Sequence, residues 1–115
     1  MTIVRIGKTH RLCDAVIYNG IAYLSGAVGR TGTDIASQTK AALDEIDDVL
    51  KEAGTDKSRL LSATIWLADI TDIDAMNVVW DAWVDKDNPP ARATGQVPLA
   101  RDKYRIEITV TAAVA

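Results

Sequence analysis

Arg92 is the residue whose type and setting are best suited to hold a small acidic molecule. Residues 91–97 alternate, so Arg92, Thr94 and Gln96 are expected on one face of a strand, with small or apolar residues on the other. Small neighbours leave room around a guanidinium, whose planar N–H donors match both oxygens of a carboxylate. Arg92 could instead be a charge that keeps an edge strand from aggregating. The spacing alone leaves both interpretations open.

Glu107 is an acidic residue inside an apolar run, between Ile106 and Ile108. A carboxylate in such a place can hold or deprotonate a water molecule, a role that typically contributes roughly 10²–10⁴-fold in rate. It can equally form a structural ion pair with a neighbouring strand. The sequence slightly favours the ion pair.

Three glycines, Gly26, Gly29 and Gly32, lie between a strand-like run and a helix-like run, where phosphate-binding loops occur. Their spacing matches neither of the common nucleotide-binding patterns, and no Gly-Lys-Ser/Thr follows. We therefore interpret them as a requirement of loop geometry. Backbone amides near Gly26 can still donate to an anion, because glycine permits close approach.

The chain has one cysteine, Cys13, and one histidine, His10. An intrachain disulfide is therefore excluded, and metal sites and Ser–His–Asp triads lack the clusters that they need. Cys13 is most simply a small buried apolar residue at the start of a strand, rather than a nucleophile activated by His10. We expect no metal site.

The length and composition are those of an ordinary globular protein. With 48% hydrophobic and 25% charged residues, the chain is expected to form a single domain over residues 1–115. No apolar run is long enough to span a bilayer, and the N-terminus is too polar for a signal peptide, so a cytoplasmic location is expected. A formal net charge of −3 with scattered basic residues disfavours nucleic acid as the main partner.

The elements that must position these residues follow from hydrophobic periodicity and turn signals. The dipeptide Asn19-Gly20 suits a type I′ turn and predicts a hairpin between two β-rich runs. Helical apolar stripes predict two helices. The predicted strands are residues 2–6, 14–18, 21–25, 60–67, 91–97 and 104–114, and the predicted helices are residues 34–53 and 71–84.

Local patterns add detail to these elements. In the strand 60–67, Leu61 and every second residue after it are expected on one side. Residues 71–74 resemble a capping box that opens the second helix. The three tryptophans, Trp66, Trp80 and Trp83, are expected to fill core and interface space.

Strands connected through helices are expected to run parallel, with right-handed crossovers that place both helices on one face of the sheet. This arrangement is an α+β sandwich whose other sheet face is uncovered. In the last strand, apolar residues alternate with a polar, threonine-rich set that includes Glu107, Thr109 and Thr111. Such a face is too apolar for solvent and too polar for a core, so we interpret it as an oligomer surface with sites in its seams.

In their order along the chain, short segments resemble landmarks of the Rid (reactive-intermediate deaminase) family, formerly called the YjgF family. The resemblance covers essentially the whole chain. The segments are Leu24-Ser25-Gly26, Ala63-Thr64-Ile65-Trp66-Leu67-Ala68-Asp69, Met76-Asn77-Val78-Val79-Trp80, Pro90-Ala91-Arg92-Ala93-Thr94 and Arg105-Ile106-Glu107-Ile108.

The resemblance implies a chorismate-mutase-like fold with the last strand between the third and fourth, and a homotrimer with sites at the subunit clefts. It implies hydrolysis of 2-aminoacrylate-type enamines and imines to 2-keto acids and ammonia, with no metal or cofactor. Fixing the substrate and one water suffices there, because an imine carbon is already electrophilic. The implied site residues are Arg92 for the substrate carboxylate, Glu107 for the attacking water, Ser25 and Gly26 as pocket lining, and Asn77 and Thr94 as further substrate contacts.

The chain departs from the deaminase branch at two places. A Gly-Pro-Tyr segment that supplies a tyrosine to the site is replaced by residues 11–15, and the cysteine often found two places after the arginine is Thr94. These departures resemble a divergent branch of the family. A trimeric binder or sensor of small keto or amino acids therefore stays open. An endoribonuclease or translation inhibitor is the third alternative, which the acidic charge and the lone His10 disfavour.

Overall fold

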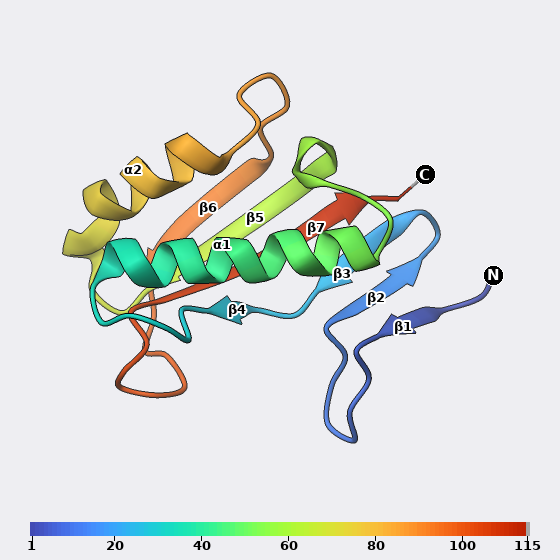
Figure 1. Ribbon diagram of the computed structural model, residues 1–115, viewed down its shortest axis with the longest axis horizontal. Coiled ribbons are helices and arrows are strands. Elements are labelled where there is room, and N and C mark those ends of the chain that lie inside the picture. Colours follow the sequence, from blue (N-terminus) through green and yellow to red (C-terminus); the bar gives the residue numbers. More distant parts are fainter. Residues whose placement is uncertain (115) are drawn as a thin grey trace.

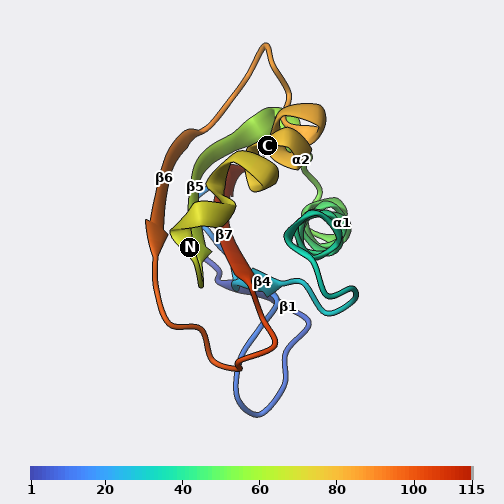
Figure 2. The same cartoon turned by 90° about the vertical axis from the view of Figure 1, so that its left-hand side faces the viewer.

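The chain forms a mixed β-sheet with two helices on one face (Figures 1 and 2). The computed structural model describes residues 1–114. The strands are β1 (Val4–Ile6), β2 (Ala15–Tyr18), β3 (Ile21–Leu24), β4 (Ala27–Val28), β5 (Leu60–Leu67), β6 (Ala91–Gln96) and β7 (Ile106–Ala113). The helices are α1 (Ile35–Glu52) and α2 (Ile73–Trp83), with short 3-10 helices at Lys57–Arg59 and Ile70–Asp72. The α+β class and all the predicted elements are confirmed, with ends shifted by at most two residues, and β4 is an additional strand.

The last strand in sequence, β7, lies in the middle of the sheet. The strand order is β1-β2-β3-β7-β5-β6, and β4 also pairs with β7. Strands β3, β4 and β5 are antiparallel to β7, whereas β5 and β6 are parallel. The strands joined through each helix therefore run in the same direction. This confirms the predicted parallel connections and the place of the last strand between the third and fourth predicted strands.

The hairpin between β2 and β3 turns at Asn19 and Gly20, whose φ angles are 53° and 78°. Tyr18 and Ile21 pair on either side of the turn. A type I′ turn requires positive φ at both central residues, which asparagine and glycine tolerate best. The predicted hairpin is confirmed.

The hydrophobic core lies between the sheet and the two helices. Every second residue of β7, from Ile106 to Ala112, is buried, as the alternation predicts. The helices contribute Leu43, Ile46 and Leu50 from α1 and Met76 and Trp80 from α2. The intervening residues of β7 face the side of the sheet that no helix covers, which is visible in the edge-on view of Figure 2.

A β-bulge separates β3 from β4. The pairing with β7 shifts by one residue between Tyr23 and Ala27. Because one residue is extra, both Leu24 and Ala27 point into the core, and Ser25 and Gly26 are exposed between them. The bulge therefore presents two candidate site residues next to each other at the surface.

A second register shift, between Leu60 and Ser62 in β5, shows that the predicted side of Leu61 is wrong. Leu60 is 6% exposed and Leu61 is 46% exposed. From Ala63 onward the residues predicted to share one side do so, and that side faces the core. The register shift reverses which residues face the core at the start of β5. A strict alternation that starts at Leu61 therefore places Leu61 on the wrong face of the sheet.

The second helix does not begin with the predicted capping box. Asp72, immediately before α2, makes no capping hydrogen bond, because its carboxylate accepts from Nη2 of Arg105 at 3.0 and 2.9 Å. Capping occurs one turn earlier, where Oδ1 of Asp69 accepts from the backbone N–H of Thr71 at 2.9 Å. The predicted cap residue, Thr71, instead donates its hydroxyl to Oδ1 of Asp69 at 2.7 Å. Asp72, which stands at the cap position, is held by its ion pair to Arg105 just before β7.

Gln38, a buried polar residue of α1, ties the helix to the loop before β7. Its Nε2 donates to the carbonyl oxygen of Lys103 at 2.9 Å, and its Oε1 accepts from the backbone N–H of Arg105 at 2.7 Å. A Cβ on Gly29 would lie 2.2 Å from Cβ of Gln38, so the loop passes the helix only with glycine there. Gly32 has a φ of +81°, which also favours glycine. Loop geometry explains these glycines, as predicted.

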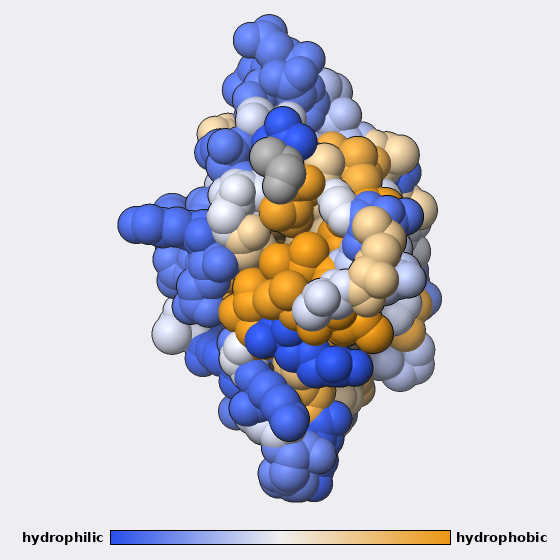
Figure 3. Space-filling model, turned by 90° about the vertical axis from the view of Figure 1, so that its right-hand side faces the viewer, coloured by the Kyte–Doolittle hydropathy of each residue, from blue (hydrophilic) through white to orange (hydrophobic). Residues whose placement is uncertain are grey.

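Apolar surface gathers at the end of the molecule formed by β1, β2 and the C-terminal ends of α1 and β7 (Figure 3). Ile6, Ile17, Val49 and Val114 come from these elements and are only partly buried against the core. The helix layer therefore leaves the core incompletely covered at this end. No helix within residues 1–114 is long and apolar enough to cross a membrane.

Replacing Gln38 with alanine removes both hydrogen bonds to the loop before β7, and we expect the free energy of unfolding to fall by about 1–2 kcal/mol. Urea denaturation measures this change. Glu52→Ala is the control, because Glu52 is exposed on the same helix and its replacement is expected to change stability by less than about 0.5 kcal/mol. Equal stability of Gln38→Ala and the parent protein would contradict the assigned role.

Candidate functional site

Arg92 lies on the edge strand β6 and projects toward α2. It pairs with Ala63 of β5, whose side chain is buried beneath the helices. Paired residues on neighbouring strands share a face, so Arg92 is on the helix side of the sheet. There Nη1 of Arg92 donates to Oδ1 of Asn77 at 2.9 Å, and Cζ lies 5.3 Å from the centroid of the Trp80 ring.

Asn77 and Trp80 meet Arg92 together because they are one helical turn apart on α2. Asn77 is half-buried and uses its side-chain carbonyl for Arg92, which leaves its amide N–H donors for another partner. Within residues 1–114, Nη1 is the one guanidinium nitrogen of Arg92 with a protein acceptor. The remaining N–H donors of Arg92 are therefore free for a carboxylate.

Trp80 is a site residue that the sequence analysis missed. It is 5% exposed and so fills the core as expected, but its ring also makes a cation–π contact with the guanidinium of Arg92. The signal that could have found it is its spacing of three residues from Asn77. Of the other tryptophans, Trp83 is half-buried, whereas Trp66 is 37% exposed on the uncovered face and is not core.

Thr94 follows Arg92 on the same face of β6. Its hydroxyl oxygen is buried and has no hydrogen-bond partner within residues 1–114. Buried polar atoms without a partner are uncommon in folded proteins. The hydroxyl is therefore a candidate contact for a bound molecule.

Glu107 lies on the opposite, uncovered face of the sheet, where it pairs with Val28 of β4 and Trp66 of β5. A Cβ on Gly26 would lie 2.6 Å from Oε2 of Glu107, so the carboxylate rests directly against the glycine of the bulge. Glu107 is half-buried. Among residues 1–114 it forms no ion pair with lysine or arginine, so the structural ion pair that the sequence slightly favoured is not formed there.

Ser25 ties the bulge to the segment before β2. Its Oγ donates to the carbonyl oxygen of Cys13 at 2.6 Å, and its backbone N–H donates to the carbonyl oxygen of Asp14 at 2.9 Å. The hydroxyl proton of Ser25 is thus in use, and its lone pairs remain for a ligand. Cys13 is a half-buried free thiol, rather than the buried residue expected, and within the described residues it makes no hydrogen bond with His10.

The structure collects the candidate residues in two groups rather than one. The arginine group, on the helix side at β6, consists of Arg92, Asn77 and Thr94, with Trp80 beneath it. The glutamate group, on the uncovered side at the bulge, consists of Glu107, Gly26 and Ser25. Strand β5 lies between β6 and β7. The two groups therefore do not form one site within a protomer.

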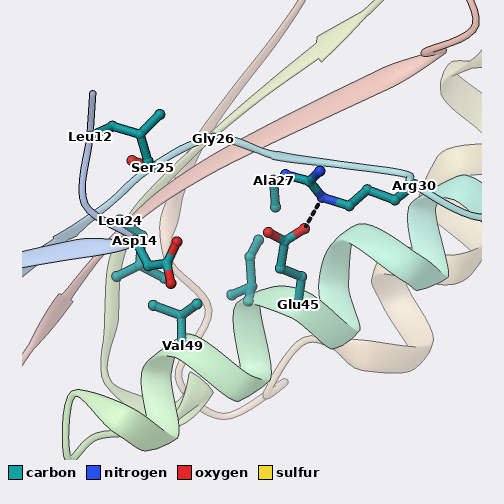
Figure 4. A pocket seen from close by; sticks show the side chains of 10 residues that line it. Leu12, Asp14, Leu24, Ser25, Gly26, Ala27, Arg30, Glu45 and Val49 are labelled. Atoms are coloured by element: carbon teal, nitrogen blue, oxygen red, sulfur yellow. Dashed lines mark ion pairs between the residues drawn. The ribbon is translucent and has the colours of Figure 1, made fainter. Parts of the chain in front are cut away.

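A small cavity of about 80 Å³ opens beside the bulge, on its helix side (Figure 4). It lies between the bulge and α1, with Leu12 at one end and an ion pair at the other, where Nε of Arg30 is 3.7 Å from Oε2 of Glu45. Ser25 and Gly26 of the glutamate group line it, whereas Arg92 and Glu107 do not. The cavity therefore meets the glutamate group only at the bulge and is separate from the arginine group.

Comparison with known proteins identifies the family of this chain. The family model described as endoribonuclease L-PSP matches residues 2–114. The chain belongs to the YjgF/Rid family. A crystal structure of a YjgF family member from Neisseria meningitidis has a TM-score of 0.98 and 44% sequence identity, and the match covers 100% of this chain and 97% of that chain.

Two relatives of known name extend the comparison within the YjgF/Rid family. The RutC family protein YoaB of Escherichia coli (strain K12) is 46% identical over 114 residues, which cover 99% of this chain and 100% of that protein. The 2-iminobutanoate/2-iminopropanoate deaminase of Homo sapiens is 33% identical over 105 residues, which cover 85% of this chain and 76% of that protein. The sequence-based recognition of the family is confirmed.

Replacing Gly26 with alanine is expected to move the carboxylate of Glu107 while preserving the fold. The new Cβ would overlap that carboxylate, and the flexible glutamate side chain can rotate away at a cost below about 1.5 kcal/mol. Crystal structures and urea denaturation of the variant test both parts. Gly95→Ala is the matched control, because a Cβ there meets nothing within 4 Å. A Glu107 side chain that keeps its position in Gly26→Ala would contradict the close packing of the two residues.

Proposed function

We propose that this protein is a deaminase that hydrolyses small 2-enamine and 2-imine acids to 2-keto acids and ammonia. The observation that carries the proposal is the guanidinium of Arg92, held by Asn77 and Trp80 with donors free for a substrate carboxylate. The human relative named as a 2-iminobutanoate/2-iminopropanoate deaminase supports this class of substrate.

The reaction needs a fixed substrate and one positioned water. An enamine tautomerises to the imine, and water adds to the imine carbon to give a tetrahedral carbinolamine. Glu107 accepts a proton from the water as it adds to the protonated imine, and then returns that proton to the nitrogen of the carbinolamine. The C–N bond breaks, ammonia leaves, and the hydroxyl proton passes to the departing ammonia as the carbonyl forms. A protonated imine carbon is already electrophilic, and holding the reactants together supplies most of the remaining acceleration.

The binding roles divide between the two groups of residues. Arg92 holds the substrate carboxylate, and the amide of Asn77 and the hydroxyl of Thr94 complete the same wall. Gly26 and Ser25 form the wall beside Glu107. The hydroxyl of Ser25 already donates to a backbone carbonyl, so it would receive a hydrogen bond from the substrate nitrogen rather than donate one.

A homotrimer would unite the two groups at the clefts between subunits. Within one protomer they lie on opposite faces of the sheet, separated by β5. The uncovered face also carries large side chains that are exposed in the protomer and suit an interface: Tyr18, Tyr23, Leu61 and Trp66. A closed ring of protomers would bury this face and set the arginine group of one beside the glutamate group of the next.

The deaminase activity is tested by adding the purified protein to a threonine or serine dehydratase and following the release of keto acid. We expect acceleration, and a loss of roughly 10²-fold in Arg92→Ala, because the substrate carboxylate loses its charged partner. Arg101→Ala is the control, since Arg101 is an exposed arginine outside both groups.

The other outcomes of this assay separate the alternatives. No acceleration, together with keto-acid binding that Arg92→Ala abolishes, would replace the deaminase with a non-catalytic binder or sensor. RNA cleavage that survives Arg92→Ala would indicate a different site or a contaminant. Neither turnover nor keto-acid binding would contradict the proposed role of Arg92.

The shared site is tested by co-expressing Arg92→Ala and Glu107→Gln protomers. Each variant alone is expected to be inactive, and random mixing in trimers restores about a quarter of the sites, because a site then needs an intact Arg92 from one protomer and an intact Glu107 from the other. Sedimentation reports the assembly. A monomeric protein, or co-expressed variants with no recovered activity in mixed trimers, would contradict the proposed cleft.

A further inference from the structure

We propose that Trp80 is a positioning residue that fixes the plane of the Arg92 guanidinium and so sets the affinity for the substrate carboxylate. This inference rests on the proposed function, in which Arg92 is the carboxylate anchor. Its basis is the cation–π placement of the guanidinium over the indole, with Cζ of Arg92 5.3 Å from the ring centroid.

The indole is itself firmly held. Trp80 is 5% exposed, and its ring packs against Trp83 with centroids 5.3 Å apart and planes inclined at 49°. Nε1 of Trp83 donates to Oδ2 of Asp47 on α1 at 3.0 Å, and Nζ of Lys57 lies 5.3 Å from the centroid of the Trp83 ring. Contacts from α1 and from the turn before β5 thus hold Trp83, and Trp83 in turn restricts the movement of the Trp80 ring.

The two contacts of Arg92 constrain different motions. The hydrogen bond to Asn77 fixes the position of Nη1 but allows the guanidinium to turn about the N–H···O direction. The cation–π attraction to the Trp80 ring provides a second point of contact and so opposes that rotation. Arg92 is exposed on an edge strand, where a free arginine side chain would lose much rotamer freedom on binding a ligand. Trp80 therefore prepares the anchor before the carboxylate arrives.

The first test uses the ligand-free protein and follows the Nε–H group of Arg92 by NMR relaxation. We expect a well-ordered signal in the parent protein and a mobile one in Trp80→Leu, with Trp80→Tyr and Trp80→Phe between them in that order. The aromatic variants preserve packing if Trp80→Leu does not fold. Val79→Ala is the control, since it changes the packing of α2 without touching Arg92. An Arg92 signal equally ordered in the parent protein and all the folded Trp80 variants would overturn the inference.

The second test measures the Kd for 2-ketobutyrate by calorimetry. We expect Trp80→Leu to weaken binding about 3- to 30-fold and Trp80→Tyr to restore most of it. In an Arg92→Ala background the tryptophan change should cause no further loss, because Trp80 acts through Arg92. An unchanged Kd in folded Trp80→Leu, or equal losses with and without Arg92, would overturn the inference. No binding by the parent protein would refute the proposed function instead, and the NMR result would still decide the role of Trp80.

Discussion

The alternation of side chains along β7 is the constraint on which the rest of the molecule depends. β7 lies in the middle of the sheet, and its residues that face the helix side, from Ile106 to Ala112, are buried in the core. Because neighbouring side chains on a strand point to opposite faces, Glu107 must face away from the helices. Burial of these β7 residues therefore also determines on which face the carboxylate of Glu107 lies. A shift in the alternation would disrupt the core and displace Glu107 at the same time.

The packing of α2 on the sheet gives Arg92 its setting. An arginine on an exposed edge strand ordinarily has many conformations, but α2 brings an amide oxygen and an indole face to it one turn apart. The core position of Trp80 and the hydrogen bond of Trp83 to α1 make that surface rigid. The conformation of Arg92 is thus a property of the packed helix and strand rather than of the arginine alone. In the homotrimer that we propose, the glutamate group of a second protomer would complete the site.

Features that depend on local signals were predictable from the sequence. Asn19-Gly20 predicted the hairpin, and the alternation around Glu107 predicted which residues of the last strand are buried. The side of Leu61 and the existence of β4 were not predictable in this way, because a bulge inserts one residue without leaving a periodic signal. The capping box predicted from Thr71 is wrong for a related reason, since Asp72, which stands at the cap position, pairs with Arg105, a residue distant in the sequence.

The candidate site was predicted residue by residue but not in its arrangement. The resemblance to the Rid family nominated Arg92, Asn77, Thr94, Glu107, Ser25 and Gly26. A single sequence does not show which face of the sheet each residue occupies when the order of the strands in the sheet differs from their order in the chain. Trp80 was overlooked because burial explains a tryptophan without invoking a ligand. Its second role follows from the distance to Arg92, which only the packing of α2 on β6 determines.

A crystal structure of the assembled protein with 2-ketobutyrate bound would show directly whether Arg92 and Glu107 of two protomers share one site. We expect carboxylate oxygens within about 3 Å of the Arg92 guanidinium, and the keto carbon facing Glu107 of a neighbouring protomer. A ligand bound away from Arg92, or one that contacts Arg92 and Glu107 of the same protomer, would contradict it.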